Sequence, residues 1–320
     1  MLSRVADTLY WMSRYLERAE HTARVIDVNL NLMLDQSPAS AASRWERVLA
    51  ALRAHGPEGE AIDPYAICRS LTFDAENPSS IAACVALARE NARQVRELIS
   101  SEMWEQLNRL YFQVRRASLV DIWAGQPHEF FNGVKDGAHL FRGITDSTLC
   151  QGEPYHFIEV GRFLERASAS AALLDVHFGT LEDWHDPAIA AAQHLEWVGL
   201  LRSCTAFEAY CKVYTADMQP ERIAEFLLLN DEFPHSVRFA VDMIQSALEK
   251  IGEATESRKT ARIDRLAGRL RASLSFGQID EIVVSGLHTY LDDVLRQCGH
   301  VHAAIHQLYI AYPIETALEA

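Results

Sequence analysis

Two arginines surround a glutamate twice in this chain, in RYLERA at 14–19 and in RFLERA at 162–167. The planar guanidinium group binds a carboxylate or a phosphate through two parallel hydrogen bonds. Each motif holds two arginines for one glutamate, so the arginines left over after pairing would bind an anionic ligand. Arginine also stays protonated at neutral pH and is a poor general base, which favours binding over catalysis.

The first motif lies in a segment whose apolar residues recur every three or four positions, from Ser3 to about Leu34. This spacing predicts one long amphipathic helix. Tyr10, Trp11 and the charged residues of the motif fall together on the face opposite the apolar stripe. A second helix, expected over Pro154–Phe178, presents the second motif in the same way.

The rest of the chain has the same periodicity, and only 10 prolines and 15 glycines interrupt 320 residues. The sequence therefore predicts an all-α protein, a helical bundle without a sheet. Further helices are expected at about 42–54, 65–72, 79–99, 102–124, 128–141, 187–215, 221–229, 235–250, 257–275 and 278–309. The predicted breaks are at 55–64, 125–127, 150–154 and 184–187.

A shift of 148 residues superimposes the two motifs, and eight of the fifteen positions from 14 to 28 are then identical. A second shift, of 156 residues, aligns 64–80 with 220–236, including their prolines. We therefore predict an internal duplication with repeats at about 1–150 and 151–320. No flexible linker separates the repeats, so we expect residues 1–320 to form a single domain with a pseudo-twofold relation. Its two charged helices would then meet and build one site.

Three interpretations of that site follow from the residues. In the first, the arginine surplus binds a carboxylate or phosphate ligand. In the second, the ion pairs only fix the register of the helices, since removing one partner of a buried pair is costly. In the third, Glu17 or Glu165 acts as an acid or base in an enzyme, with a pKa raised by burial and by neighbouring carboxylates.

Composition excludes several other classes of function. The formal charge is −14 and the basic residues are scattered singly, so we expect no nucleic-acid partner. No segment is long and apolar enough for a signal peptide or a membrane span. Six widely spaced cysteines suit reduced thiols, and we expect a cytoplasmic protein. His302 and His306 have the i, i+4 spacing of metal ligands but no H-E-x-x-H motif accompanies them, so we expect neither a metal nor another cofactor.

The opening MLSRVADTLYWMSRYLERAEHTARVIDVN and the stretches at 77–108 and 140–167 resemble the Alpha-E family, all-helical bacterial proteins with a recurrent Glu-Arg motif. The resemblance implies two partners, a circularly permuted ATP-grasp protein and a transglutaminase-like protein, in systems that make or modify peptides. It implies no established reaction. The predicted ligand-binding residues, carried over by motif, are Tyr10, Trp11, Arg14, Glu17, Arg18, Arg162, Glu165 and Arg166.

The chain departs from the family pattern after Asp146. There the family tends to show a methionine followed by a basic and an acidic residue, and this chain reads LCQGE at 149–153. A ligand contact from that basic residue is therefore not expected. The sequence favours an accessory helical protein that binds an ATP-grasp peptide ligase, or its peptide or carboxylate substrate, through the Arg/Glu cluster.

Overall fold

The computed structural model describes residues 3–33, 38–54, 63–118, 120, 122, 127–180, 193–215, 217–255 and 261–310. Every regular element within these ranges is a helix, so the all-α prediction is confirmed. The described residues include no strand. Apolar side chains from the whole length of the chain form one continuous buried core.

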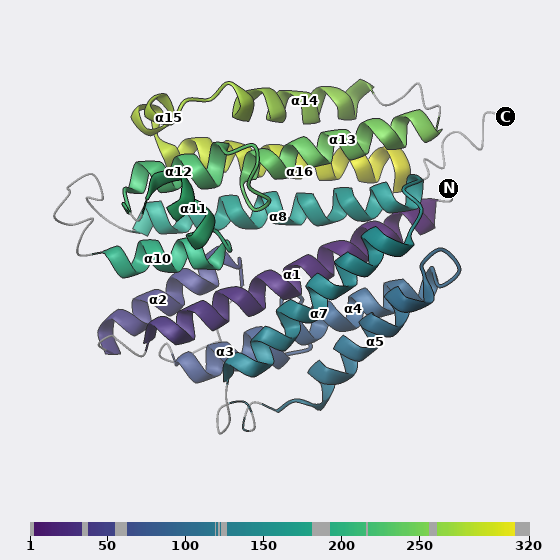
Figure 1. Cartoon of the computed structure of the whole chain (residues 1–320), viewed down its shortest axis with the longest axis horizontal. Helices are drawn as coiled ribbons and strands as arrows, with labels where there is room; N and C mark the ends of the chain where they lie inside the picture. The colour runs from purple at the N-terminus through teal and green to yellow at the C-terminus, as the bar shows by residue number, and fades with distance from the viewer. Residues whose placement is uncertain are drawn as a thin grey trace.

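The helices of the first half lie together in the lower part of Figure 1. Within this half, the longest helix, α1, packs mainly against α4 and α7. Their bounds are α1 Ser3–Met33, α2 Pro38–Ala51, α3 Pro64–Phe73, α4 Ile81–Gln94, α5 Ser101–Arg116 and α7 Pro127–Thr148.

The helices of the second half lie above them, around α8, which packs against α13 and α16 (Figure 1). Their bounds are α8 Glu153–Thr180, α10 His194–Ser203, α11 Phe207–Tyr214, α12 Pro220–Leu229, α13 Val237–Thr255, α14 Ala261–Ser275, α15 Ile279–Ser285 and α16 Leu287–Ile305. A single π-helical turn, η1 at His306–Ile310, follows α16. The predicted breaks at 55–64 and 184–187 lie almost wholly outside the described residues.

Two segments predicted as single helices are each divided in two. The helix expected over 187–215 is interrupted between α10 and α11, where Thr205 has a φ of 53°. The helix expected over 278–309 is interrupted between α15 and α16 at Gly286, whose φ is 105°. A positive φ ends the α-helical hydrogen-bonding pattern, and the apolar periodicity on either side gives no sign of it.

Pro78 and Pro234, which the 156-residue shift aligns, lie outside the first turns of their helices, although proline suits that position. They lie three residues before α4 and α13, and a serine begins each helix instead. The Ser80 hydroxyl accepts the N–H of Ala83 at 3.1 Å, and the Ser236 hydroxyl accepts an N–H at 3.0 Å in the same way. The helices begin at the serines because a serine hydroxyl accepts a hydrogen bond from a main-chain N–H of the first turn, which a proline side chain cannot do.

The closest approach of the two halves is between α1 and α8, which lie side by side across the middle of the molecule (Figure 1). Gly161 of α8 makes this possible. A Cβ atom on Gly161 would collide with the main-chain carbonyl oxygen of Tyr10 and with the hydroxyl of Ser13. The glycine therefore brings the two motif-bearing helices within reach of each other's side chains.

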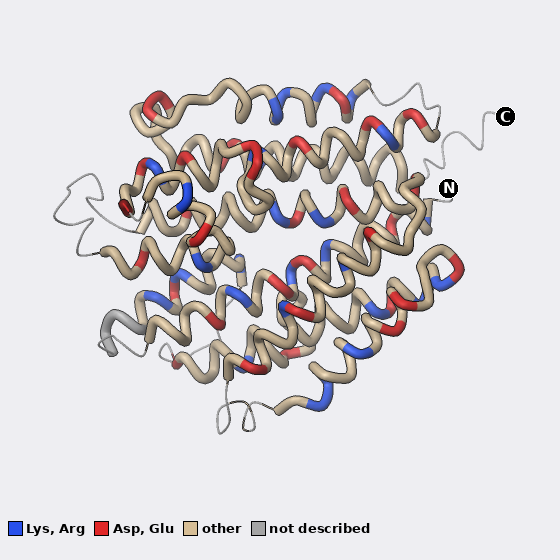
Figure 2. The backbone as a smooth tube through the Cα atoms, viewed as in Figure 1, with Lys and Arg blue, Asp and Glu red and all other residues tan. Residues whose placement is uncertain are grey.

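Charged residues of both signs alternate along most helices, without a stripe of one sign in the view of Figure 2. Among the described residues, none of the helices has the length and apolarity needed to cross a membrane.

Candidate anion-binding site

Across the α1–α8 contact, the glutamate of each motif pairs with arginine from the other motif. Arg166 donates to both carboxylate oxygens of Glu17, at 2.5 and 2.9 Å. In the opposite direction, Arg18 donates to both oxygens of Glu165, at 2.6 and 3.2 Å. Arg14 donates to the same Glu165 at 2.7 Å. One carboxylate is therefore shared by two guanidinium groups, while the other carboxylate serves one.

Tyr10 and Trp11 hold Arg14 in place. Arg14 Nη1 donates to the Tyr10 hydroxyl oxygen at 3.0 Å, and its guanidinium carbon lies 4.8 Å from the centre of the Trp11 ring. The Tyr10 hydroxyl and His302 Nδ1 of α16 are 2.7 Å apart, and their rings are stacked. The two predicted aromatic residues thus position an arginine of the motif.

Arg162, the remaining predicted arginine, is turned away from this group. It donates to Glu159 one turn earlier at 2.6 Å, and its guanidinium carbon lies 4.2 Å from the Phe163 ring centre. Both charged side chains are buried. Burial lowers the pKa of Arg162 to about 10 and raises that of Glu159.

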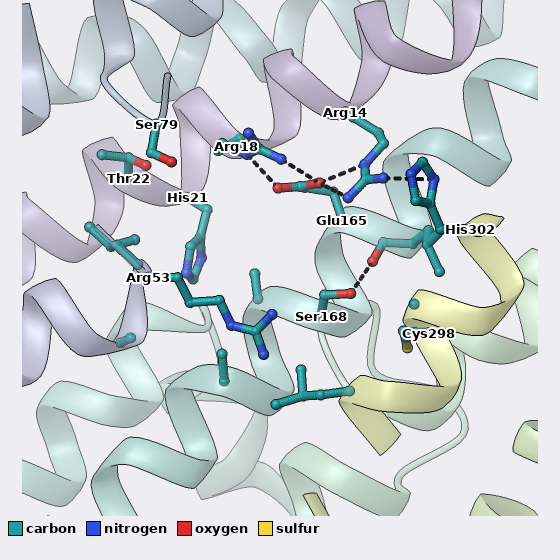
Figure 3. Close-up of a pocket in the computed structure, with 17 residues that line it drawn as sticks. Arg14, Arg18, His21, Thr22, Arg53, Ser79, Glu165, Ser168, Cys298 and His302 are labelled. Carbon is teal, nitrogen blue, oxygen red and sulfur yellow. Dashed lines mark hydrogen bonds and ion pairs between the residues drawn. The ribbon is translucent and has the colours of Figure 1, made fainter. Parts of the chain in front are cut away.

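A cavity of about 290 Å³ lies beside Glu165 (Figure 3). Its wall is built from α1, α8, α16, the end of α2 and the residues before α4. The polar and charged side chains that line it are Arg14, Arg18, His21, Thr22, Arg53, Ser79, Glu165, Ser168, Cys298 and His302. Three guanidinium groups thus face a single carboxylate, which leaves two positive charges on the wall.

Arg53 supplies one of these charges, and it extends from the end of α2 into the cavity (Figure 3). Its side chain makes no hydrogen bond or ion pair with any other residue that the structure describes. Its main chain is unusual as well, with a φ of 50°, in the left-handed region that glycine normally occupies.

The end of α2 explains that conformation. The N–H of Ala54 donates to the carbonyl of Leu49, and the N–H of Arg53 to that of Ala50. These are the two hydrogen bonds of a Schellman motif, in which the residue after the helix must be left-handed and is usually glycine. Arginine at this place costs about 1 kcal/mol in backbone strain.

Several polar atoms of the wall have no partner among the described residues. Nε2 of His21 and Oγ1 of Thr22 are buried and unsatisfied, and Nη1 of Arg18 donates no hydrogen bond. Burial lowers the pKa of His21, so its ring is neutral at pH 7. Buried polar atoms without partners are rare in native proteins, and a bound ligand is one way to satisfy them.

The electrostatics of the wall are those of a cationic site. Burial disfavours the charged form of Glu165, but Arg14 and Arg18 outweigh it and hold the pKa of this carboxyl below its usual value. The prediction of a raised pKa is therefore wrong for Glu165, because it left out the second arginine. Burial and the neighbouring Arg14 lower the pKa of His302 to about 4, so this imidazole is neutral and accepts hydrogen bonds.

A second, much smaller cavity of about 40 Å³ lies beside the Glu17–Arg166 ion pair, between α1, α7 and α8. Here the charges balance, because three arginines face three glutamates. They are Arg142, Arg162 and Arg166 with Glu17, Glu20 and Glu159. The surplus positive charge of the duplicated motif is therefore confined to the larger cavity.

The eight predicted site residues thus divide into two groups. Arg14, Arg18 and Glu165 line the larger cavity, with Tyr10 and Trp11 beside them, whereas Glu17, Arg162 and Arg166 line the smaller one. Sequence reasoning missed Arg53, Thr22, Ser79 and Ser168. No sequence signal marks Arg53, whose role depends on a turn. Ser168 could have been found, since it replaces Glu20 at the 148-residue shift.

Fold and site together define a class of protein: a helical bundle in which two long helices exchange Glu-Arg ion pairs beside a cationic cavity. The chain belongs to the Alpha-E family, described as a predicted alpha-helical domain with a conserved ER motif, which it matches over residues 1–310. The exchanged glutamates and arginines are the ER pairs of this sequence, and the resemblance seen in the sequence is confirmed.

Three curated mycobacterial proteins are similar to nearly the whole chain. The uncharacterized protein Mb2597 of Mycobacterium bovis is 23% identical over 94% of this chain, and the uncharacterized protein Rv2567 of Mycobacterium tuberculosis is 22% identical over the same share. The chain spans 35% of the length of these relatives. No solved structure is significantly similar to it.

Proposed function

We propose that this protein binds a small anionic ligand, a carboxylate or a phosphate, in the 290 Å³ cavity beside Glu165. The observation that carries the proposal is the charge of the wall, where three guanidinium groups meet one carboxylate. Arg14 and Arg18 are largely removed from solvent while Arg53 stays exposed, and an anion bound between them would neutralise the excess charge. The free nitrogens of Arg18 and Arg53 are the donors that would bind that anion.

A second part of the proposal concerns the partner proteins. We propose that it is an accessory protein of an ATP-grasp peptide ligase and a transglutaminase-like protein, and that it binds the ligase or its peptide or carboxylate substrate. This part rests on the family resemblance alone. Copurification with these two proteins, followed by an assay of ATP-dependent amide formation with and without this chain, tests it.

Two other functions compete with ligand binding. An enzyme that uses Glu165 as an acid or base finds little support, since two arginines keep this carboxyl ionised and occupy both of its oxygens. A purely structural role fits the small cavity, where each charge is balanced. It does not account for Arg53, whose main chain is strained and whose side chain has no hydrogen-bond or ion-pair partner among the described residues.

The binding proposal is tested by a calorimetric titration of the purified chain with acetate, glutamate, inorganic phosphate and, as a neutral control, acetamide. Arg18→Lys removes the forked donor and should weaken anion binding 10- to 100-fold, about 1.5–3 kcal/mol for a charged hydrogen bond. Arg166→Lys is the matched control, 148 positions away, and should lower stability without changing the affinity of the large cavity. If no anion releases or absorbs heat with the wild-type chain, the proposal is wrong.

A further inference from the structure

The two cavities occupy corresponding places in the fold. Residues 16, 17, 20, 162 and 166 line the small cavity, and the residues 148 positions away from them, 164, 165, 168, 14 and 18, line the large one. The two cavities can therefore be compared position by position, and each serves as a reference for the other.

The small and the large cavity differ at several aligned positions of α1 and α8, and two of these differences concern a single ion pair. The small cavity contains Glu20, whose carboxylate pairs with Arg24 one turn later. In the large cavity the corresponding positions are Ser168 and Ala172, and both line the empty volume. A carboxylate and its cation have thus been exchanged for a hydroxyl and a methyl group.

The Glu20 carboxylate stands close to the cations of its cavity. Burial disfavours the charged form of Arg166, but Glu17 and, more distantly, Glu20 raise its pKa. Arg14 and Arg18 of the large cavity correspond to Arg162 and Arg166 of the small one. Arg53 adds a third cation, which reaches the large cavity from the end of α2 and points towards Ser168 (Figure 3). The carboxylates of Glu20 and Glu159 have no counterpart there, because Ser168 and Trp11 stand at the aligned positions.

Hydrogen bonds at the edge of the two cavities differ in the same sense. In the second half, Arg166 Nη1 donates to the carbonyl of Pro234 at 3.2 Å, and the Ser170 hydroxyl to that of His235 at 2.9 Å. In the first half, the corresponding Arg18 Nη1 makes no hydrogen bond to a described residue, and Thr22 Oγ1 is buried without a partner. The donors of Arg166 and Ser170 thus bond to main-chain carbonyls, whereas the aligned donors of Arg18 and Thr22 have no partner among the described residues.

We infer that the large cavity is a carboxylate site, in which a ligand carboxylate takes the place that Glu20 takes in the small cavity, between Arg18 and Arg53. This inference rests on the proposed function and narrows its ligand to one chemical class. The volume of about 290 Å³ beyond Ser168 would accept the rest of a small carboxylic acid or the C-terminal residue of a peptide. Thr22 would donate to the bound carboxylate from the side of α1.

The titration of the wild-type chain with separate anions tests the inference without any variant. Acetate, glutamate and a dipeptide should each bind with one site per chain, and inorganic phosphate should bind at least 10-fold more weakly. Phosphate binding as tightly as the carboxylates would overturn the carboxylate site and leave the proposed anion site standing. Absence of binding by every anion would overturn both.

A variant that copies the small cavity into the large one provides a second test. The substitution Ser168→Glu should raise the melting temperature and reduce acetate affinity more than 100-fold, because the cavity then contains its own carboxylate between Arg18 and Arg53. The matched variant Ser168→Gln fills a similar volume without the negative charge and should not gain stability. Unchanged acetate affinity in the Glu variant, or equal melting temperatures for the two variants, would contradict the inference.

Discussion

Arg18 and Arg166 each donate two hydrogen bonds to a glutamate of the opposite helix, yet only Arg166 also donates from Nη1 to a main-chain carbonyl. Each guanidinium nitrogen of Arg166 therefore donates a hydrogen bond, whereas Nη1 of Arg18 donates none to a described residue. Arg18 faces the cavity of about 290 Å³, and Arg166 faces the cavity of about 40 Å³. One Glu-Arg pair thus has the geometry of a structural ion pair, and the other has donors left over for a ligand.

Arg53 should show opposite effects on stability and on binding. Replacing it by glycine relieves the left-handed strain and should stabilise the fold by about 0.5–1 kcal/mol, measured by chemical denaturation. The same variant should lose at least 10-fold in carboxylate affinity, because one of the two free cations is gone. Arg53→Ala is the control, since it loses the guanidinium but keeps the strain. A glycine variant that binds as well as wild type would exclude Arg53 from the site.

Gly161 should be required for the contact between α1 and α8. Its replacement by alanine pushes a methyl group against the Tyr10 carbonyl and should destabilise the protein by about 1–3 kcal/mol. Gly143 of α7 is the matched control, because a Cβ there meets no atom within 4 Å and alanine favours the helix. Thermal denaturation should therefore rank Gly143→Ala at or above wild type, with Gly161→Ala below it. The reverse order would mean that the two helices do not depend on close approach.

Much of this arrangement could be predicted from the sequence. The apolar periodicity indicates the helices, and the 148-residue shift pairs Arg18 with Arg166. The internal duplication itself stays a prediction, which the contrast between the two cavities uses but does not prove. Periodicity could not predict the positive φ at Thr205 or Gly286, because two helices that meet at a sharp turn keep the same apolar spacing on both sides.

The site was harder to predict than the fold. The motif identifies Arg14, Arg18 and Glu165, since these residues are close in sequence to a repeated pattern. Arg53 lies just after the end of α2, and only the Schellman turn there directs it into the cavity. A comparison of Glu20 with Ser168 would have indicated which repeat lacks a carboxylate. A cavity without that carboxylate has arginines left to bind a ligand.

His302 should make the protein sensitive to acid. Its pKa in the folded state is about 4, below the value of about 6.5 in the unfolded chain, so the unfolded state binds more protons between these two values. Stability is then fully present above pH 6.5 and falls as the pH drops towards 4, by about 1–2 kcal/mol for a partly exposed group. Protonation would also place a cation beside Arg14 and remove the acceptor for the Tyr10 hydroxyl.

The measurement is the free energy of unfolding from pH 4 to pH 7 for wild type and for His302→Gln. The glutamine keeps an acceptor and cannot titrate, so its profile should be flatter by that amount. His288→Gln, on the same helix, is the control. Asp175 raises the pKa of the exposed His288, so this substitution should not flatten the profile. Identical slopes for His302→Gln and wild type would contradict the assignment.

Glu17 and Arg166 should behave as a buried structural pair. Glu17→Gln leaves the Arg166 charge without its carboxylate and should cost about 3–5 kcal/mol in unfolding free energy. The double variant Glu17→Gln with Arg166→Met removes both charges and should recover most of the loss. A Glu17→Gln protein that keeps its stability but loses a measurable turnover would instead support catalysis by this glutamate.

The position of the bound ligand tests the central claim most directly. Crystals of the wild-type chain soaked in 4-bromobenzoate would locate the ligand by the anomalous signal of its bromine. The carboxylate is predicted to lie between Arg18 Nη1 and Arg53, in the larger cavity, with no ligand in the smaller cavity around Glu20. A carboxylate bound anywhere else, or a larger cavity that stays empty while Arg53 turns out to solvent, would contradict the account.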